Sequence, residues 1–219
     1  MSRAFPNGAP PPEGSVSQTL SSSMQEWLAP TLPEEDFLLP HPTLGAQADP
    51  RPFLESHRDG VVIALDWPVI LEAAELTRLS RHRDLIELDR NYPARRAGQW
   101  TEASFRVGRR QLSRLKACRD LRLVQRYLSA VEDGQAHAWN PIVFGVALAA
   151  FNLPYRSGLL HYASTLLRGF AERCRPQNVP MADWRVWMDS LEAPLPEAVQ
   201  RLLPSAFTAL EPHSGAVGS

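Results

Sequence analysis

Apolar positions recur at helical spacing through most of the chain after Phe53. One stripe comprises Val69, Leu71, Ala73, Leu76 and Leu79, and segments 105–115 and 121–131 repeat a rhythm of three and four residues. This period predicts amphipathic helices that each bury one face. No stretch alternates convincingly in the two-residue period of a strand, so the pattern predicts an all-α fold.

Prolines and capping residues predict where these helices begin and end. The predicted starts are Asp66 with Pro68, Asp84, Thr101, Asp120, Asn140 with Pro141, Pro154 with Ser157, and about Pro196. The predicted ends include Pro93 after the helix 84–92, Gly134 after the helix that Asp120 opens, and Leu203. The longest apolar run, Ile142 to Phe151, shows no polar face. A helix of that kind has to be enclosed by neighbours, so we expect segment 137–175 to form the centre of a bundle.

The length of 219 residues suits a single domain with flanking tails. Residues 1–23, rich in Pro, Gly and Ser, predict a disordered tail. Residues 24–52 are punctuated by prolines and predict an extended segment on the bundle, pinned by Trp27, Phe37, Leu38 and Leu39. We expect the single-domain helical bundle over 53–205 and a flexible C-terminal tail over 206–219.

Composition sets few limits on function. The formal net charge is −1, so no global charge attracts nucleic acid or a membrane surface. The two cysteines, Cys118 and Cys174, follow no zinc spacing, and the N-terminus lacks the apolar run of a secretory signal. We therefore expect a cytoplasmic protein without a membrane span.

One local charge asymmetry stands out between Arg95 and Arg126. This stretch contains ten basic and two acidic residues, a net of eight positive charges. Two interpretations stay open. The patch could dock an acidic partner protein or RNA, or it could be two solvated arginine faces paired with acidic residues from 34–36 or from 183–197. Few aromatic residues interleave the patch, which makes nucleic acid the less favoured partner.

The sequence offers little for catalysis. Its six histidines are scattered, with no pair at i and i+3 or i+4, so no helix presents a two-ligand metal face. Cys118 lies between Lys116 and Arg119 without a nearby histidine, and His161 falls in a segment dense in Leu and Ala. These two residues are the candidates for an alternative enzyme hypothesis, while the expectation is a protein without catalytic, cofactor or metal residues.

The order of several short motifs between Leu65 and Gln177 resembles the urease accessory protein F family. The motifs are Leu65-Asp-Trp-Pro, Glu87-Leu-Asp, Glu102-Ala-Ser-Phe-Arg-Val-Gly-Arg-Arg-Gln-Leu, His137-Ala-Trp-Asn-Pro-Ile-Val-Phe-Gly and Ala171-Glu-Arg-Cys-Arg-Pro-Gln. The family's opening motif is eroded over 32–45, where Leu32, Pro33 and Phe37 remain but its glycines and serine do not.

The resemblance implies a urease maturation scaffold that helps load nickel into apo-urease and catalyses nothing itself. Such scaffolds dimerise, bind a second accessory protein called D or H, and present a surface to the accessory GTPase G. Nickel and GTP would then belong to the partners. The candidate partner contacts are His41, Arg106, Arg109, Arg110, Arg173, Arg175, Gln177, Trp184 and Trp187. For the two tryptophans, three residues apart, the alternative is that they cover their own core, which such pairs do more often than they contact a partner.

Overall fold

The computed structural model describes residues 49–95, 101–116, 119–176 and 178–203, without the side chains of 93–95, 101–103 and 173. Over these residues the chain is helical and contains no strand, which confirms the predicted all-α class. The elements are α2 (Arg51–His57), a π-helical segment (Arg58–Asp66), α3 (Trp67–Arg78), α4 (His82–Arg95), α5 (Thr101–Leu115), α6 (Arg122–Glu132), α7 (Asn140–Ala150), α8 (Tyr155–Cys174), α9 (Met181–Glu192) and α10 (Leu195–Leu202).

The first described helix runs without a break from Arg51 to Arg78, and its middle part is π-helical. At the end of that part the Trp67 N–H donates to the Val62 carbonyl, five residues earlier. Arg58 fixes the π-helical segment to the end of α9 by donating to the Leu191 carbonyl at 3.0 Å. Asp66 therefore stands directly before α3 with Pro68 in the first turn, as predicted, but the prediction that its side chain caps a new helix is wrong. Asp66 has helical backbone angles, and its buried carboxylate accepts the hydroxyl groups of Tyr92 and Tyr162 in place of a helix N–H.

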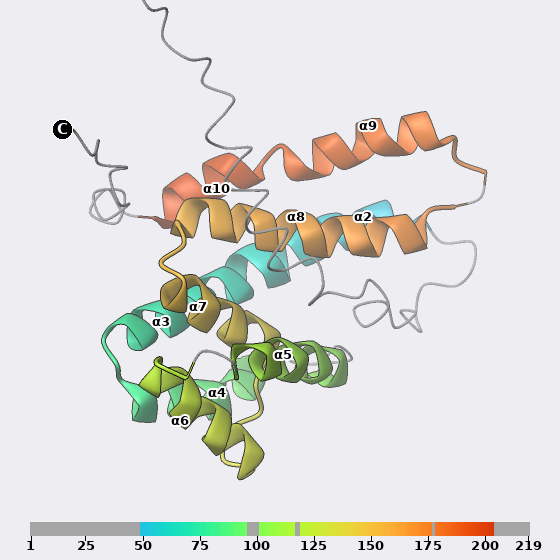
Figure 1. Ribbon diagram of the computed structural model, residues 1–219. Coiled ribbons are helices and arrows are strands. Elements are labelled where there is room, and N and C mark those ends of the chain that lie inside the picture. Colours follow the sequence, from blue (N-terminus) through green and yellow to red (C-terminus); the bar gives the residue numbers. More distant parts are fainter. Residues whose placement is uncertain (1–48, 96–100, 117–118, 177, 204–219) are drawn as a thin grey trace, which may run out of the picture.

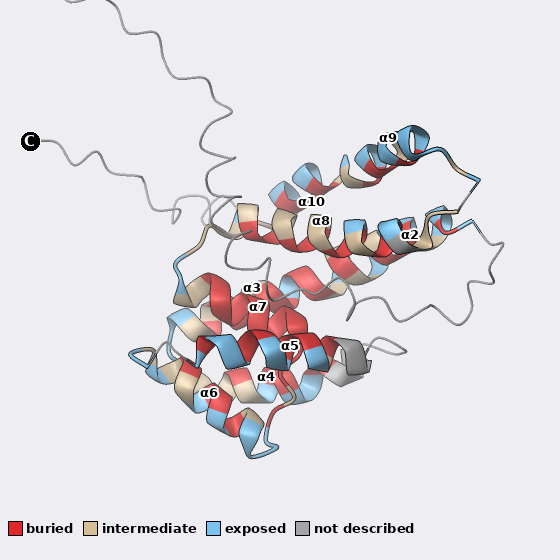
Figure 2. Ribbon diagram, turned by 45° about the vertical axis from the view of Figure 1, so that its right-hand side comes forward, coloured by how far each residue is buried: buried red, intermediate tan, exposed pale blue. Residues whose placement is uncertain are grey.

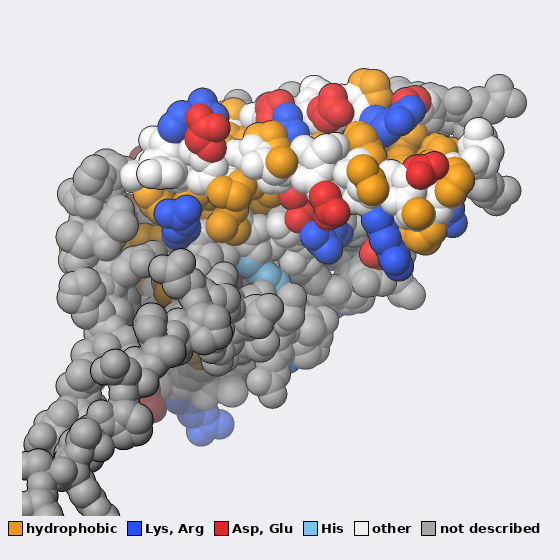
Figure 3. Space-filling model, turned by 90° about the horizontal axis from the view of Figure 1, so that it is seen from above, with side chains coloured by type: hydrophobic (Ala, Val, Ile, Leu, Met, Phe, Trp, Pro, Cys, Tyr) orange, Lys and Arg blue, Asp and Glu red, His pale blue; other side chains and the backbone are white. Residues whose placement is uncertain are grey.

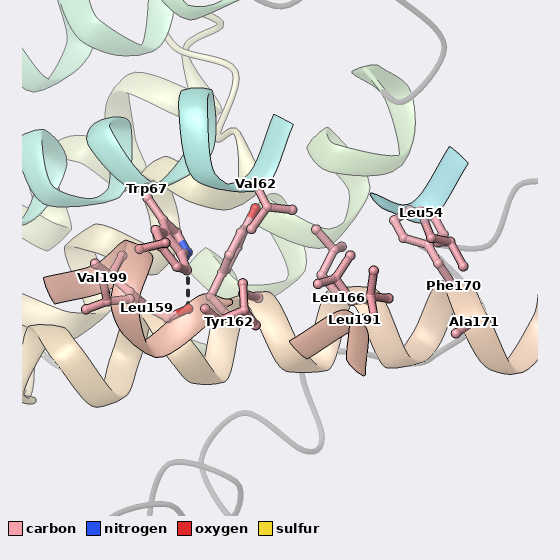
Figure 4. Close-up of a cluster of buried hydrophobic side chains, with 14 of the residues drawn as sticks. Leu54, Val62, Trp67, Leu159, Tyr162, Leu166, Phe170, Ala171, Leu191 and Val199 are labelled. Carbon is pink, nitrogen blue, oxygen red and sulfur yellow. Dashed lines mark hydrogen bonds between the residues drawn. The ribbon is translucent and has the colours of Figure 1, made fainter. Parts of the chain in front are cut away.

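The bundle has two lobes, each with its own hydrophobic cluster (Figure 1). The α8–α10 lobe packs these three helices against α2 and the π-helical segment, and Figure 4 shows Leu54 beside Phe170 and Trp67 donating to the Leu159 carbonyl at 3.1 Å. The α4–α6 lobe gathers side chains such as Leu85, Leu112 and Val124. Both clusters include residues of α3 and α7, so this helix pair joins the lobes.

Helix α7 occupies the centre of the molecule, as its lack of a polar face predicts. Every residue from Asn140 to Leu148 is buried (Figure 2). Its contact with α3 is close because Gly145 has no side chain. A Cβ at this position would lie 2.3 Å from the Ile70 carbonyl oxygen and 2.9 Å from the Ala73 Cβ. Glycine is therefore required for the helix crossing that joins the two lobes.

Several predicted boundaries are confirmed, whereas those of α4, predicted over 84–92 and found over His82–Arg95, and of α6 differ. Helices α5, α7 and α8 begin where Thr101, Asn140 and Pro154 predict them. Helix α4 continues past Pro93 to Arg95, because a proline in the last turn removes only one hydrogen bond of the helix. Helix α6 begins at Arg122 with Leu121, not Asp120, as its N-cap residue. In the described part of the chain, no helix has the length and apolarity that a bilayer crossing requires.

Candidate partner-binding surface

A buried carboxylate on α4 organises the loop that leads into α7. Asp89 is fully buried, and its Oδ1 accepts the N–H of His137 at 2.5 Å. Its Oδ2 accepts the N–H groups of Ala138 at 3.0 Å and of Trp139 at 3.4 Å. Three successive backbone donors of the loop 135–139 thus converge on one side chain.

The backbone of this loop is shaped around the Asp89 carboxylate. Ala138 has φ of +61°, the left-handed region that a residue with a Cβ adopts only where its surroundings impose it. Consecutive N–H groups around such a residue form a concave anion site, and the positive end of α7 adds to it. The Tyr127 hydroxyl completes the set by donating to Asp89 Oδ2 at 2.6 Å. Burial, and secondly the Asp89 charge, raise the pKa of Tyr127 well above its usual value, so the hydroxyl stays a donor.

Helix α5 lies directly on the same loop. A Cβ at Gly108 would lie 1.9 Å from the Ala138 carbonyl oxygen, so the helix backbone touches the loop backbone at this point. Ser104 Oγ accepts the Asn140 N–H at 3.2 Å, and Arg109 Nε donates to the His137 carbonyl at 3.4 Å. Helix α5 and the loop 135–139 therefore form one unit, which we call the α5–loop surface.

Aromatic side chains continue this unit into the core. The Phe105 ring lies 5.2 Å from the His137 ring and 4.2 Å from the Trp139 ring, measured between centroids. Trp139 in turn meets Tyr92 edge to face at 5.0 Å. On the outer side, the Arg109 guanidinium lies 5.9 Å from the centre of the Phe105 ring, within the range of a cation–π contact.

The structure brings together three of the predicted partner-contact residues on the α5–loop surface. Arg106, Arg109 and Arg110 are all exposed, and so is Arg114 one turn later. Figure 2 shows α5 with exposed residues along its outer side and buried ones beneath. At the far end of α5, Lys116 forms an ion pair with Glu132 of α6 at 3.2 Å. The surface therefore offers positive charge beside a loop whose backbone is held by hydrogen bonds.

A second buried carboxylate joins the two lobes. Asp66 Oδ1 accepts the hydroxyl of Tyr92 from α4, and Oδ2 accepts the hydroxyl of Tyr162 from α8 at 2.8 Å. The Tyr162 oxygen also accepts Asn140 Nδ2 from the start of α7 at 3.3 Å. We call this set of four side chains the Asp66 joint.

The joint and the Asp89 contacts explain how the short motifs of the sequence meet in space. Asp66 and Asp89 were not singled out as site residues. For Asp89 a signal existed, because Leu85, Leu88, Asp89 and Tyr92 share one helical face. A charged residue on an otherwise apolar face indicates a buried carboxylate with partners.

The predicted contacts near the C-terminal end lie in the α8–α10 lobe. Trp184 is buried and Trp187 half-buried, with ring centroids 4.7 Å apart. Arg175 is half-buried and donates to the Val179 carbonyl at 2.9 Å. Seen from above, this face mixes apolar side chains with charges of both signs (Figure 3). Met181 and Val186 are its large exposed apolar residues, at 47% and 71%.

The remaining predicted residues include four whose position or side chain the structure does not describe. His41, Gln177 and Cys118 lie outside the described residues, and so does the side chain of Arg173. His161 is half-buried beside Thr165, and burial lowers its pKa. Within the ranges that the structure covers, no group of three His, Cys, Asp or Glu residues could hold a metal ion.

The α5–loop surface lies in a region of the chain that is similar to a known protein family. The model of the UreF family matches residues 46–172, more than half of the chain. The matched range contains the α5–loop surface and the Asp66 joint, and it ends before α9. A search of curated proteins and a search of solved structures each found no match.

Proposed function

The chain belongs to the UreF family, which implies a urease accessory role, and from this premise we propose that it is a scaffold for nickel insertion into urease. It would bind the D/H accessory protein and the nickel-carrying GTPase and help to load apo-urease. The observation that carries this proposal is the family match over residues 46–172. The proposal includes action in the cytoplasm and no catalysis by this chain, with nickel and GTP held by its partners.

The α5–loop surface supports an interaction role. Four exposed arginines follow one side of α5, and arginine is suited to bidentate contacts with carboxylates. Their helix rests on a loop whose backbone is fixed from beneath, so less order has to be gained on binding. We assign this surface to the GTPase, through an acidic patch on that partner.

The α8–α10 lobe is the proposed site for the D/H accessory protein. Helix α9 lies on the far side of α8 from α5 (Figure 1), in the other lobe, so both partners could bind at once. Its partly exposed apolar side chains, Met181, Val186 and Trp187, are of the type that anchors protein interfaces. Within the complex we expect two copies of this chain to associate.

The test is a charge reversal on α5 in cells that depend on this chain for active urease. The variant replaces Arg106, Arg109 and Arg110 by Glu. The control replaces three exposed arginines outside the Arg95–Arg126 stretch, Arg78, Arg83 and Arg156, by Glu. Both change the net charge equally. We expect the α5 variant alone to lose GTPase affinity by roughly tenfold or more, because the reversed charges would repel an acidic partner.

Two measurements read the outcome: the affinity of the purified complex for the GTPase, and the nickel content of urease. The D/H protein should still co-purify with the α5 variant. Equal losses in the variant and the control would contradict the assigned surface. Normal nickel loading of urease in cells that lack the whole chain would overturn the scaffold function.

A further inference from the structure

We propose that Asp89 is a positioning residue for partner binding at the α5–loop surface, although it is fully buried and cannot touch a partner. The inference rests on the proposed function, because it concerns the same surface. Asp89 lies beneath that surface and holds the loop backbone on which the arginine-bearing helix rests.

The conformation of the loop 135–139 depends on the Asp89 carboxylate. Its two oxygens accept the N–H groups of His137, Ala138 and Trp139 and the hydroxyl of Tyr127. The left-handed backbone at Ala138 is unfavourable for a residue with a Cβ. Because the carboxylate is where these donors converge, its removal leaves the loop free to relax out of the left-handed conformation.

The loop conformation in turn sets the position of the α5 arginines. Gly108 touches the Ala138 carbonyl oxygen, and Arg109 donates to the His137 carbonyl. A rotation of either peptide would displace an atom that α5 contacts directly. It would also move the His137 ring, which packs 5.2 Å from Phe105 on the same helix. Loss of the carboxylate is thus transmitted to the exposed face.

Asp89→Asn is the substitution that tests this role. Asn has nearly the same shape as Asp, but its amide nitrogen donates a hydrogen bond and cannot accept one. In Asp89→Asn the amide NH2 would replace one carboxylate oxygen. Its hydrogens would then point at N–H or O–H groups that are themselves donors. The matched control is Asp84→Asn, on the same helix with the same change in charge, where the carboxylate forms a surface pair with Arg81.

The experiment uses the full chain with its purified partners. Hydrogen exchange is measured at the amides of 137–139, and affinity is measured for the GTPase and for the D/H protein. In Asp89→Asn we expect the loop amides to exchange more than tenfold faster and the GTPase affinity to fall roughly tenfold. The D/H affinity should stay within about twofold of wild type, which general unfolding would not allow. Asp84→Asn should match wild type in all three.

The outcomes separate this inference from the proposed function. If the Arg106, Arg109 and Arg110 reversal leaves GTPase affinity unchanged, the surface itself is wrongly assigned. If that reversal weakens binding but Asp89→Asn loosens the loop without changing GTPase affinity, the positioning role is refuted. Should Asp89→Asn not fold, Tyr127→Phe serves instead, since it removes one of the four donors to Asp89. It should produce smaller changes in the same two measurements, and unchanged values in both would refute the role.

Discussion

The contact between α5 and the loop 135–139 depends on a single glycine. At Gly108 the missing side chain lets the helix backbone meet the Ala138 carbonyl oxygen. Gly108 falls in the segment 105–115, whose apolar rhythm predicts one buried face, and the structure shows that Gly108 is buried. The periodicity could not show that the neighbour is a backbone atom, because the loop lies 30 residues further along the chain.

Gly108→Ala should destabilise the protein by roughly 1–3 kcal/mol, the range for an oversized group in a packed site. The added Cβ would meet backbone, which cannot move aside as a flexible side chain can. Gly169→Ala in α8 is the control, because nothing lies within 4 Å of its Cβ position. It should stabilise the helix by about 0.5–1 kcal/mol. Chemical denaturation measures both, and equal effects would contradict the close approach.

The raised pKa of Tyr127 predicts that the folded protein loses stability in alkaline solution. Its pKa is raised in the folded state, so its contribution is fully present below the unfolded tyrosine pKa of about 10. Above that value the unfolded chain releases the proton and the folded chain keeps it. The free energy of unfolding should therefore fall with rising pH, by at most about 1.4 kcal/mol per unit from this group. In Tyr127→Phe the free energy of unfolding should fall less steeply between about pH 10 and 11, the first unit above the unfolded tyrosine pKa. Identical slopes in the variant and the wild type would contradict the assignment.

At the scale of elements, the Asp66 joint connects three helices to the end of the π-helical segment. One carboxylate accepts hydroxyl groups from α4 and α8, and the α8 tyrosine also accepts the amide of Asn140 in α7. Prolines and polar residues at positions such as Asn140 and Pro154 predicted where helices begin, because their effect is local. The sequence did not reveal the joint, since the pattern around Asp66 is also typical of a capping residue followed by proline.

Asp66→Asn should cost roughly 1.5–3 kcal/mol, the range for hydrogen bonds to a charged group. The amide nitrogen cannot accept a bond, so one of the two buried hydroxyl groups would lose its acceptor. Glu192→Gln provides the contrast, because it weakens the surface pair that links Arg168 of α8 to α9 at 2.6 Å. That change should cost less than about 1 kcal/mol. Thermal or urea unfolding separates the two, and a smaller cost at Asp66 would contradict the joint.

At the scale of the whole molecule, the two lobes share the helix pair α3 and α7. Both hydrophobic clusters take side chains from these helices, and neither cluster would be complete without them. The apolar character of 142–151 predicted a central helix correctly. It could not predict two lobes, because which neighbours cover which side of α7 depends on contacts between distant segments.

The shared pair predicts that the lobes unfold together. Tryptophan fluorescence, which reports from both lobes, and far-ultraviolet circular dichroism should give coincident transitions in urea. Gly145→Ala should lower the common midpoint, because its Cβ would lie 2.3 Å from the Ile70 carbonyl oxygen. Two separate transitions in the wild-type protein would show that the α3–α7 contact does not couple the lobes.

The π-helical segment gives the long helix tolerance to changes in its length. Wide turns of this kind hold more residues per turn than an α-helix, so removing one residue lets the segment tighten toward regular α-helical winding. Asp66 could then keep facing its two tyrosines while Leu54 stayed against Phe170. Among relatives of this chain, we expect one-residue insertions and deletions in this helix to concentrate between residues 58 and 65, just ahead of the aspartate.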